Sequence, residues 1–125
     1  MSPENVSETG AGPPPAEMPW EVDVATVATW LREGRDFLLL DVREREEFES
    51  AKIEGAALIP LSELGQRLDE LTPHQSRHIV VHCHHGGRSM RVTEALRSRG
   101  FPRVQNMAGG IDDWSQQIDP TVPRY

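Results

Sequence analysis

Short apolar runs separated by stretches of helical pattern dominate the chain from Trp20 onward. Residues 37–40 are a continuous apolar run, and residues 78–82 contain a second one between two histidines, as expected of strands that are buried on both faces of a sheet. Shorter runs at residues 57–59 and 103–107 predict two further strands. Because these strands alternate with helical segments, the pattern predicts an α/β domain built on a largely parallel sheet.

Apolar residues at helical spacing predict the elements between the first strands. Asp23 can cap a helix that contains Val24, Val27, Ala28 and Leu31, and Gly34 supplies its stop. Residues 44–50 suit a short, charged helix, and Ser62 is expected to open another one. The inward side of that helix is expected to consist of Leu64, Leu68 and Leu71.

Two more helices are predicted toward the C-terminus. The first covers residues 88–99 and is stopped by Gly100. Its inward-facing residues are expected to be Val92, Ala95 and Leu96. After the strand at residues 103–107, Gly109 and Gly110 turn the chain into a final helix around Trp114.

Length and composition limit the organisation and the classes of partner. The chain has 125 residues, enough for one domain, which we place at residues 20–125 behind a flexible, proline-rich tail at residues 1–19. A formal net charge of −7 argues against nucleic acid as a partner. The apolar runs are too short to span a membrane, and no secretory signal is visible, so a cytoplasmic location is expected.

Asp41 and Cys83 lie at the carboxyl ends of the two buried strands that the sequence predicts. In parallel sheets, ligands bind beyond the carboxyl ends of the strands. Cys83 is also the one cysteine of the chain, which rules out an internal disulfide. This placement makes Cys83 the first candidate for chemistry.

The loop that follows Cys83 contains residue types that stabilise an anion. It consists of His84, His85, Gly86, Gly87, Arg88 and Ser89. The N–H groups at the start of the next helix carry partial positive charge, and two glycines let successive N–H groups point inward. Arg88 adds a cation, and the histidines can add donors. These groups favour thiolate, which is the nucleophile, and would also hold an anionic persulfide.

Three other interpretations of this segment explain its residues less well than an anion-binding loop does. A buried structural cysteine before an ordinary glycine turn explains Cys83 alone but not the glycines, histidines and arginine together. A metal site is disfavoured because neighbouring residues of a strand point to opposite faces and no second ligand cluster exists. A nucleotide site is disfavoured because no Gly-Lys-Ser or Gly-Lys-Thr follows the glycines.

Several segments together resemble the rhodanese family of sulfurtransferases. Residues 39–44, 53–56 and 59–61 look like its first two signatures, residues 80–89 resemble its active-site loop, and residues 100–101, 104, 106–107 and 109–111 with Trp114 resemble its closing segment. The resemblance covers residues 20–125 in the right order and spacing. One departure is Lys52, which stands where family members commonly have histidine.

The resemblance implies a five-stranded, mainly parallel sheet flanked by helices on both faces. It implies that Cys83 is the sulfur-carrying nucleophile and that backbone N–H groups of His84 through Ser89 bind the transferred sulfur. Asp41 and Arg43 match an element beside the loop, where they are expected to be supporting residues. Trp114 is expected to be part of the core.

Two finer features of the resemblance bear on function. Dual-specificity phosphatases of this fold separate their cysteine and arginine by five residues, whereas four residues separate Cys83 from Arg88 here, which suits sulfur better than a phosphoryl group. Residues 114–125 are similar to rhodanese domains fused to adenylyltransferases of the ubiquitin-activating superfamily, which serve cofactor sulfur delivery. The 125 residues contain no adenylyltransferase part, so a free-standing version is expected.

The leading hypothesis is therefore a sulfurtransferase in which Cys83 takes sulfane sulfur from thiosulfate or a persulfide and passes it to a thiophilic acceptor. No metal or organic cofactor is implied. The expected partners are a small-molecule donor and acceptor, and a sulfur-accepting protein in the alternative hypothesis of a persulfide delivery module for cofactor sulfur supply. The third hypothesis is a cysteine-dependent phosphatase.

Overall fold

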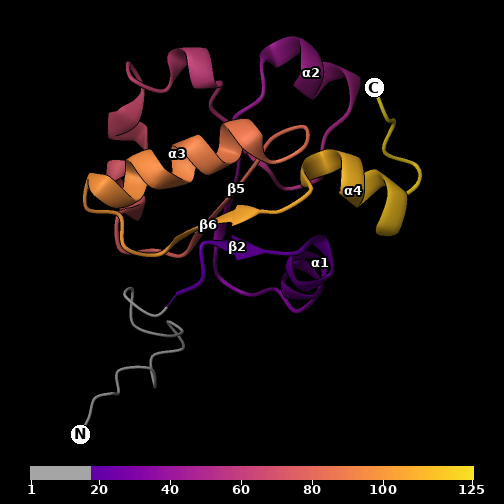
Figure 1. The fold of residues 1–125 in the computed structure, drawn as a ribbon, viewed down its shortest axis with the longest axis horizontal. Helices are drawn as coiled ribbons and strands as arrows, with labels where there is room; N and C mark the ends of the chain where they lie inside the picture. Colours follow the sequence, from indigo (N-terminus) through magenta and orange to yellow (C-terminus); the bar gives the residue numbers. More distant parts are fainter. Residues whose placement is uncertain (1–17) are drawn as a thin grey trace, which may run out of the picture.

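A computed structural model describes residues 18–125 and shows a five-stranded sheet between two layers of helices (Figure 1). The strand order is β2-β6-β5-β3-β4, and every neighbouring pair is parallel. The strands are β2 (Glu21–Val22), β3 (Leu38–Asp41), β4 (Ala57–Leu58), β5 (Ile79–His82) and β6 (Val104–Met107). The helices are α1 (Val24–Arg32), α2 (Arg45–Ser50), α3 (Gly87–Ser98) and α4 (Gly110–Gln117), with short 3-10 turns η2 (Leu61–Glu63), η3 (Leu68–Glu70) and η4 (Thr72–His74). The predicted α/β class and parallel sheet are confirmed.

Both faces of the sheet are buried. Side chains alternate between the two faces along the central strands β3 and β5, and apolar residues lie on each face. Leu40, Val81 and Cys83 belong to a core on one face, which α3 and the 3-10 turns cover. Leu39 and Val80 belong to a second core on the other face, under α1 and α4. Figure 1 shows α3 and α1 on opposite sides of the strands. The thiol of Cys83 therefore points toward the α3 side of the sheet.

Local capping sets where the first two helices begin. The Asp23 side chain accepts a hydrogen bond of 2.9 Å from the backbone N–H of Thr26, as the sequence predicts. At α2, Glu44 and Glu47 form a reciprocal capping box, in which each side chain accepts from the backbone N–H of the other. This box fixes the Glu47 side chain at the first turn of α2, close to the carboxyl ends of the strands.

The predicted helix after Ser62 is wrong. The segment forms three separate 3-10 turns instead, although Leu64 and Leu71 are buried as expected. The Ser62 hydroxyl donates to Glu44 at 2.7 Å and does not cap a helix. Gly65 and Pro73 interrupt the run, and both residue types disfavour a continuous helix. These two leucines are thus buried although the backbone of the segment is not α-helical.

Two further details of the sequence interpretation needed correction. Ala95 was expected to face inward on α3, but it is exposed, and Thr93 is buried instead. The Thr93 hydroxyl is accommodated there because it donates to the Ser89 carbonyl at 2.8 Å. Strand β2 was not predicted, because two residues are too few to show a period. It is defined by its pairing to Asn106 and Met107 of β6.

At the N-terminal end of the described chain, Met18 and Pro19 pack against the domain although the sequence interpretation placed them in the tail. Met18 is buried, and the Pro19 carbonyl accepts from Arg97 and Gln105, both at 3.0 Å. The rest of the predicted tail, residues 1–17, lies outside the described residues. No helix within residues 18–125 is both long and apolar enough to cross a membrane.

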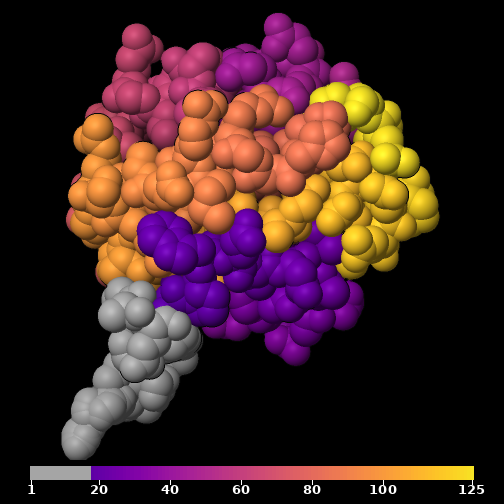
Figure 2. All heavy atoms as spheres, viewed as in Figure 1, coloured from indigo at the N-terminus to yellow at the C-terminus, as the bar shows by residue number. Residues whose placement is uncertain are grey.

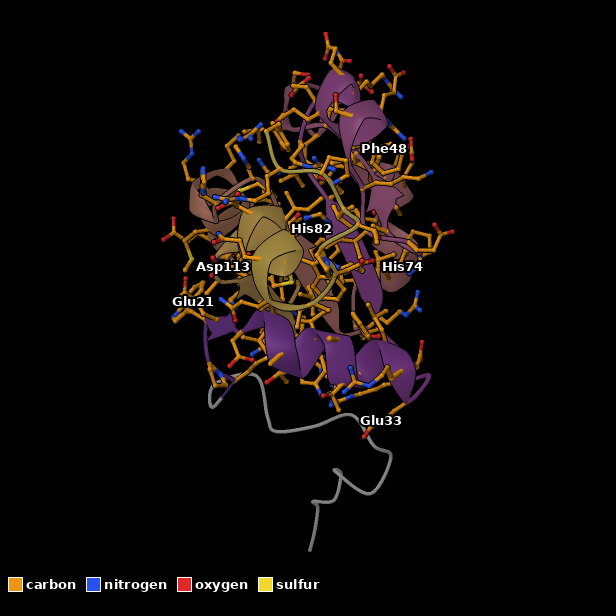
Figure 3. All side chains as sticks on the ribbon, turned by 90° about the vertical axis from the view of Figure 1, so that its right-hand side faces the viewer. Glu21, Glu33, Phe48, His74, His82 and Asp113 are labelled. Atoms are coloured by element: carbon orange, nitrogen blue, oxygen red, sulfur yellow. The ribbon has the colours of Figure 1, made fainter. Side chains whose placement is uncertain are left out.

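The C-terminal segment returns to the part of the molecule that holds α2 and the loop after β5. Figure 2 shows its atoms, in yellow, packed beside both of these segments. Figure 3, turned by 90°, shows α4 and the C-terminal segment in front of the sheet, with His82 in the interior. The last residue of the chain is thereby brought close to the carboxyl end of β5.

Candidate active site

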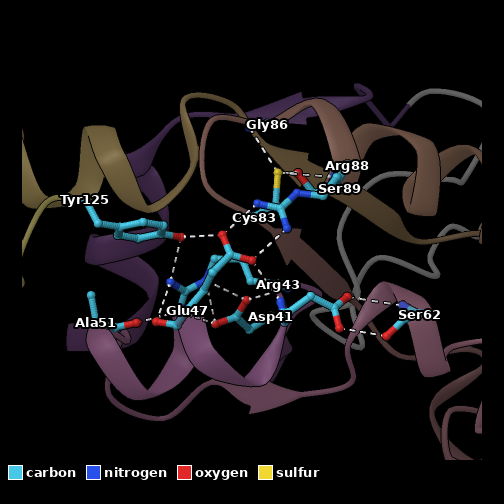
Figure 4. Close-up of polar contacts among 11 residues, drawn as sticks. Asp41, Arg43, Glu47, Ala51, Ser62, Cys83, Gly86, Arg88, Ser89 and Tyr125 are labelled. Atoms are coloured by element: carbon cyan, nitrogen blue, oxygen red, sulfur yellow. Dashed lines mark hydrogen bonds and ion pairs between the residues drawn. The ribbon is translucent and has the colours of Figure 1, made fainter.

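The loop between β5 and α3 surrounds the sulfur of Cys83 with hydrogen-bond donors (Figure 4). The backbone N–H of Gly86 donates to Sγ at 3.1 Å and that of Ser89 at 3.3 Å. Gly86 has a φ of +120°, a conformation that strains residues with a side chain. The turn at Gly86 therefore depends on glycine, and it is this turn that directs the N–H back toward the sulfur.

Backbone N–H groups in the first turn of α4 donate hydrogen bonds to backbone carbonyls of the same loop. The N–H groups of Ile111 and Asp112 donate to the carbonyls of Cys83 and His84 at 2.9 and 3.0 Å. Gly110 permits this approach, because a Cβ at this position would lie 2.6 Å from the Cys83 carbonyl oxygen. The Gly109-Gly110 turn thus fixes the Cys83 loop and does more than reverse the chain.

The Ser89 side chain connects the sulfur to β6. Its Oγ lies 3.3 Å from Cys83 Sγ and donates to Oδ1 of Asn106. The amide nitrogen of Asn106 donates to Glu21 at 3.1 Å and to the Gly86 carbonyl at 3.3 Å, which fixes the orientation of the carboxamide. Asn106 consequently braces both ends of the turn that holds the sulfur.

The guanidinium of Arg88 forms its hydrogen bonds with a carboxylate and not with the Cys83 sulfur. It donates to both carboxylate oxygens of Glu47, at 2.8 and 2.9 Å. The Tyr125 hydroxyl also donates to Glu47 at 2.9 Å and accepts from Arg43 at 2.9 Å. Arg88 holds the pKa of Glu47 down at about 2, and the same pair raises the pKa of Arg88. Both partners are therefore charged at neutral pH.

Asp41 and Arg43 form a fully buried ion pair beneath this network. The Arg43 guanidinium donates to Asp41 at 2.7 and 3.0 Å and to the Ala51 carbonyl at 2.6 Å. Burial works against the charge of Arg43, but hydrogen bonds to Asp41 and Tyr125 raise its pKa nevertheless. Through Arg43, the pair anchors the segment after β3 to α2.

The two histidines of the loop point away from the sulfur. The His84 ring stacks on Tyr125, with ring centroids 4.0 Å apart and an angle of 8° between the planes. Burial lowers the pKa of His84, and the neighbouring His85 lowers it further. His85 is exposed and lies 3.9 Å from a carboxylate oxygen of Asp112. Neither imidazole is hydrogen-bonded to Cys83 within the described residues.

The sulfur itself is nearly covered, since Cys83 is 1% exposed. A hollow of about 590 Å³ lies elsewhere, between α2 and the C-terminal segment, and Phe48, Trp114 and Val122 are among its lining residues. It contains no residue of the 83–89 loop and no nucleophilic thiol. Across residues 18–125, no group of three or more His, Cys, Asp or Glu side chains is arranged to hold a metal ion.

The structure brings all the residues singled out from the sequence to one end of the sheet, but it adds three that sequence reasoning missed. Glu47 could have been noted as the third residue after a capping glutamate, yet its pairing with Arg88 across 41 positions leaves no local signal. Asn106 and Tyr125 were seen only as parts of resembling segments. Their contacts with Ser89 and Glu47 depend on the tertiary fold.

Comparisons with known proteins identify a family and several related chains. Residues 23–117 match the family model described as "Rhodanese-like domain". The maize adenylyltransferase and sulfurtransferase MOCS3-2 is 36% identical over 74% of this chain and 20% of its own length. A sulfurtransferase of Allochromatium vinosum is 30% identical over 82% of this chain and 94% of its own. The solved structure of the human single-domain sulfurtransferase TSTD1 has a TM-score of 0.67 and 28% identity, covering 80% of this chain and 98% of that one.

The extent of these matches differs between relatives. The chain spans 30% of the Arabidopsis thaliana relative that it matches and 20% of the maize one, so it corresponds to one part of those larger proteins. The bacterial relative and the human structure are matched over nearly their whole length. On the family model and these sequence relatives, the chain belongs to the rhodanese-like domain family, whose matched members include sulfurtransferases.

Proposed function

We propose that the protein is a sulfurtransferase in which Cys83 carries sulfane sulfur as a persulfide. In the first step, the Cys83 thiolate attacks the outer sulfur of a donor such as thiosulfate or a low-molecular persulfide. The new S–S bond forms on Cys83 while the donor's S–S bond breaks, and its electron pair leaves with sulfite or a thiolate. An acceptor then attacks the outer sulfur, and Cys83 leaves as thiolate.

The observation that carries this proposal is the set of donors around Sγ. Two backbone N–H groups already point at the sulfur, from Gly86 and Ser89. The N–H groups of His85, Gly87 and Arg88 donate to no atom of the described chain, so they are available to a second sulfur bound to the first. Amides in such a turn favour an anion without adding a titratable group. A persulfide anion has the charge and size that this arrangement suits.

The acceptor follows from the same chemistry. Cyanide or a thiol, whether of a small molecule or of a sulfur-accepting protein, can attack the outer sulfur of a persulfide. No second cysteine of the chain is required, and Cys83 is the only one. A phosphatase activity has less support, because both terminal nitrogens of the Arg88 guanidinium donate to Glu47 and are not free for a phosphoryl group.

The test is the mass of the intact protein after donor treatment. We expect one added sulfur atom on the wild-type chain with thiosulfate or cysteine persulfide, none on Cys83→Ala, and loss of the added sulfur when cyanide follows. Thermal unfolding of Cys83→Ala checks that the variant is folded. Sulfur uptake by a folded Cys83→Ala protein, or no uptake by the wild type from either donor, contradicts the proposal.

A further inference from the structure

We propose that the Glu47–Arg88 ion pair sets the choice of sulfur donor, so that the site takes sulfur from a persulfide of low charge in preference to the thiosulfate dianion. The inference rests on the proposed function and specifies its donor. It concerns a carboxylate on α2 that lies outside the Cys83 loop.

The first ground is the position of Glu47. Figure 4 shows its carboxylate between α2 and the loop, with the guanidinium of Arg88 between the carboxylate and the Cys83 side chain. Both guanidinium hydrogen bonds of Arg88 are directed to Glu47 and not to the sulfur. The carboxylate thus neutralises the cation that immediately precedes Ser89 in the loop.

The second ground is that the other charged groups at this end of the sheet already have partners. Arg43 is paired with Asp41 and is fully buried. Arg124 is paired with Asp112 at 2.9 Å. The nearby hydroxyl of Tyr125 donates its proton to Glu47, so it too supports the carboxylate and not an entering anion.

The remaining cationic candidates near the loop do not replace Arg88. Burial and the neighbouring His85 both lower the pKa of His84, which disfavours its cationic form. His85 lies beside the Asp112 carboxylate. Arg91, one turn further along α3, is exposed and lines a separate hollow with Leu61 and Leu64. Backbone amides are therefore the main stabilising groups that an entering donor meets.

Charge then discriminates between donors. Thiosulfate brings two negative charges to a site whose nearest cation is neutralised, in a protein of net charge −7. Cysteine persulfide carries an ammonium and a carboxylate that cancel, so even with an ionised outer sulfur it brings one net negative charge where thiosulfate brings two. The attack has the same balance for both donors, because one S–S bond forms and one breaks. The difference lies in the cost of bringing a dianion close to Glu47.

The experiment measures the second-order rate of sulfur loading on Cys83 by intact mass, with thiosulfate and with cysteine persulfide, in the full-length chain. Glu47→Gln removes the charge but keeps a residue that serves equally well in the capping box. We expect this variant to load from thiosulfate about tenfold faster, and from cysteine persulfide with little change, since one charge beside a dianion has been removed. Arg88→Gln is expected to move the ratio of the two rates the other way.

The matched control is Glu46→Gln, which makes the same change of net charge at an exposed position one residue earlier in α2. It is expected to leave the ratio of the two rates unchanged. The salt dependence gives a readout that a structural role would not move: added salt should speed thiosulfate loading of the wild type more than that of Glu47→Gln.

The outcomes separate this inference from the proposed function. If wild-type Cys83 loads from neither donor, the proposed function itself fails. If it loads from both at similar rates, or if Glu47→Gln and Glu46→Gln change the ratio equally, persulfide formation stands and the role of Glu47 is refuted. Opposite shifts of the ratio in Glu47→Gln and Arg88→Gln support the inference, because simple loss of folding would lower both rates in both variants.

Discussion

The Ser89 hydroxyl lies 3.3 Å from the Cys83 sulfur and donates its proton to the side chain of Asn106. A hydroxyl has one proton, so in this orientation it offers only lone pairs to the sulfur. It can accept a hydrogen bond from the S–H group of the neutral thiol but donates none to the thiolate. Asn106 therefore competes with the sulfur for the Ser89 proton, and the backbone amides of Gly86 and Ser89 are left to stabilise the anion.

The first prediction follows from this competition. Asn106→Ala frees the Ser89 hydroxyl to donate to the thiolate, and we expect Cys83 to be alkylated by iodoacetamide about three- to tenfold faster at neutral pH, as one charge-assisted hydrogen bond is gained. The double variant Ser89→Ala/Asn106→Ala should lose that gain, because no hydroxyl remains. An equal acceleration in the single and double variants would show that Asn106 acts only by covering the thiol.

The second prediction concerns the contact between α4 and the active-site loop. Gly110→Ala combines a φ of +61° with a Cβ placed against the carbonyls of Cys83 and His84, so either α4 or the loop must move. We expect a loss of unfolding free energy of about 3 kcal/mol or more, together with slower sulfur loading.

Gly34→Ala is the matched control for Gly110→Ala. Gly34 has a similar φ of +68°, but a Cβ there meets no atom within 4 Å. It should cost only about 1 kcal/mol of unfolding free energy, since it adds conformational strain alone. Urea unfolding of both variants gives the comparison. Equal losses would mean that the approach of Gly110 to the loop is not tight.

The sequence was sufficient for the central strands of the sheet because these strands are buried on both faces, whereas the two-residue strand β2 was missed. Continuous apolar runs at β3 and β5 are a strong signal, and the Cys83 loop lies directly at the end of one of them. The segment after Ser62 was misread because leucines at helical spacing also suit successive 3-10 turns that bury the same side. Periodicity alone does not distinguish these backbones when Gly65 and Pro73 interrupt the run.

The sequence did not allow us to predict which charged side chains of the site pair with one another. The sequence indicates that Arg88 adds a cation at the start of the helix after Cys83, but it gives no sign of the partner Glu47, which lies on another helix. Likewise, Tyr125 reaches Arg43 only because the C-terminal segment folds back beside α2. Hydrogen-bond donors of the backbone near the sulfur, such as the N–H of Gly86, could be predicted from the local sequence. Contacts between side chains that are distant in the sequence could not.

The third prediction addresses Tyr125, whose hydroxyl links the Arg43 and Glu47 side chains. Burial raises the pKa of Tyr125 to about 12, so the phenol keeps its proton and donates to Glu47 throughout the neutral range. Tyr125→Phe retains the ring on His84 and should cost about 1 kcal/mol of unfolding free energy. Tyr125→Ala should cost more, because the stacking is lost as well. Thermal unfolding of the two variants decides whether the hydroxyl or the ring matters.

The last prediction is a loss of stability in mild acid caused by buried histidines. Burial lowers the pKa of His78 to about 4, and it also lowers that of His82. Below its ordinary value of 6.5, each imidazole binds a proton more readily in the unfolded chain than in the folded one. Their contribution to stability is therefore complete above pH 6.5 and is lost as the pH falls, for His78 down to about 4.

For His78 this linkage amounts to about 2 kcal/mol of unfolding free energy by pH 5 and about 3 kcal/mol by pH 4. Glu47, with a pKa of about 2 against an ordinary 4.5, adds its own loss only below about pH 4.5. His78→Leu places an apolar, non-titrating side chain beside Trp30 and Phe37, and urea unfolding between pH 7 and pH 5 should show a flatter dependence than in the wild type. The slopes are compared because the variant also loses the hydrogen bond to Gln105. An unchanged slope in His78→Leu would assign the acid sensitivity to His82 or to groups other than the histidines.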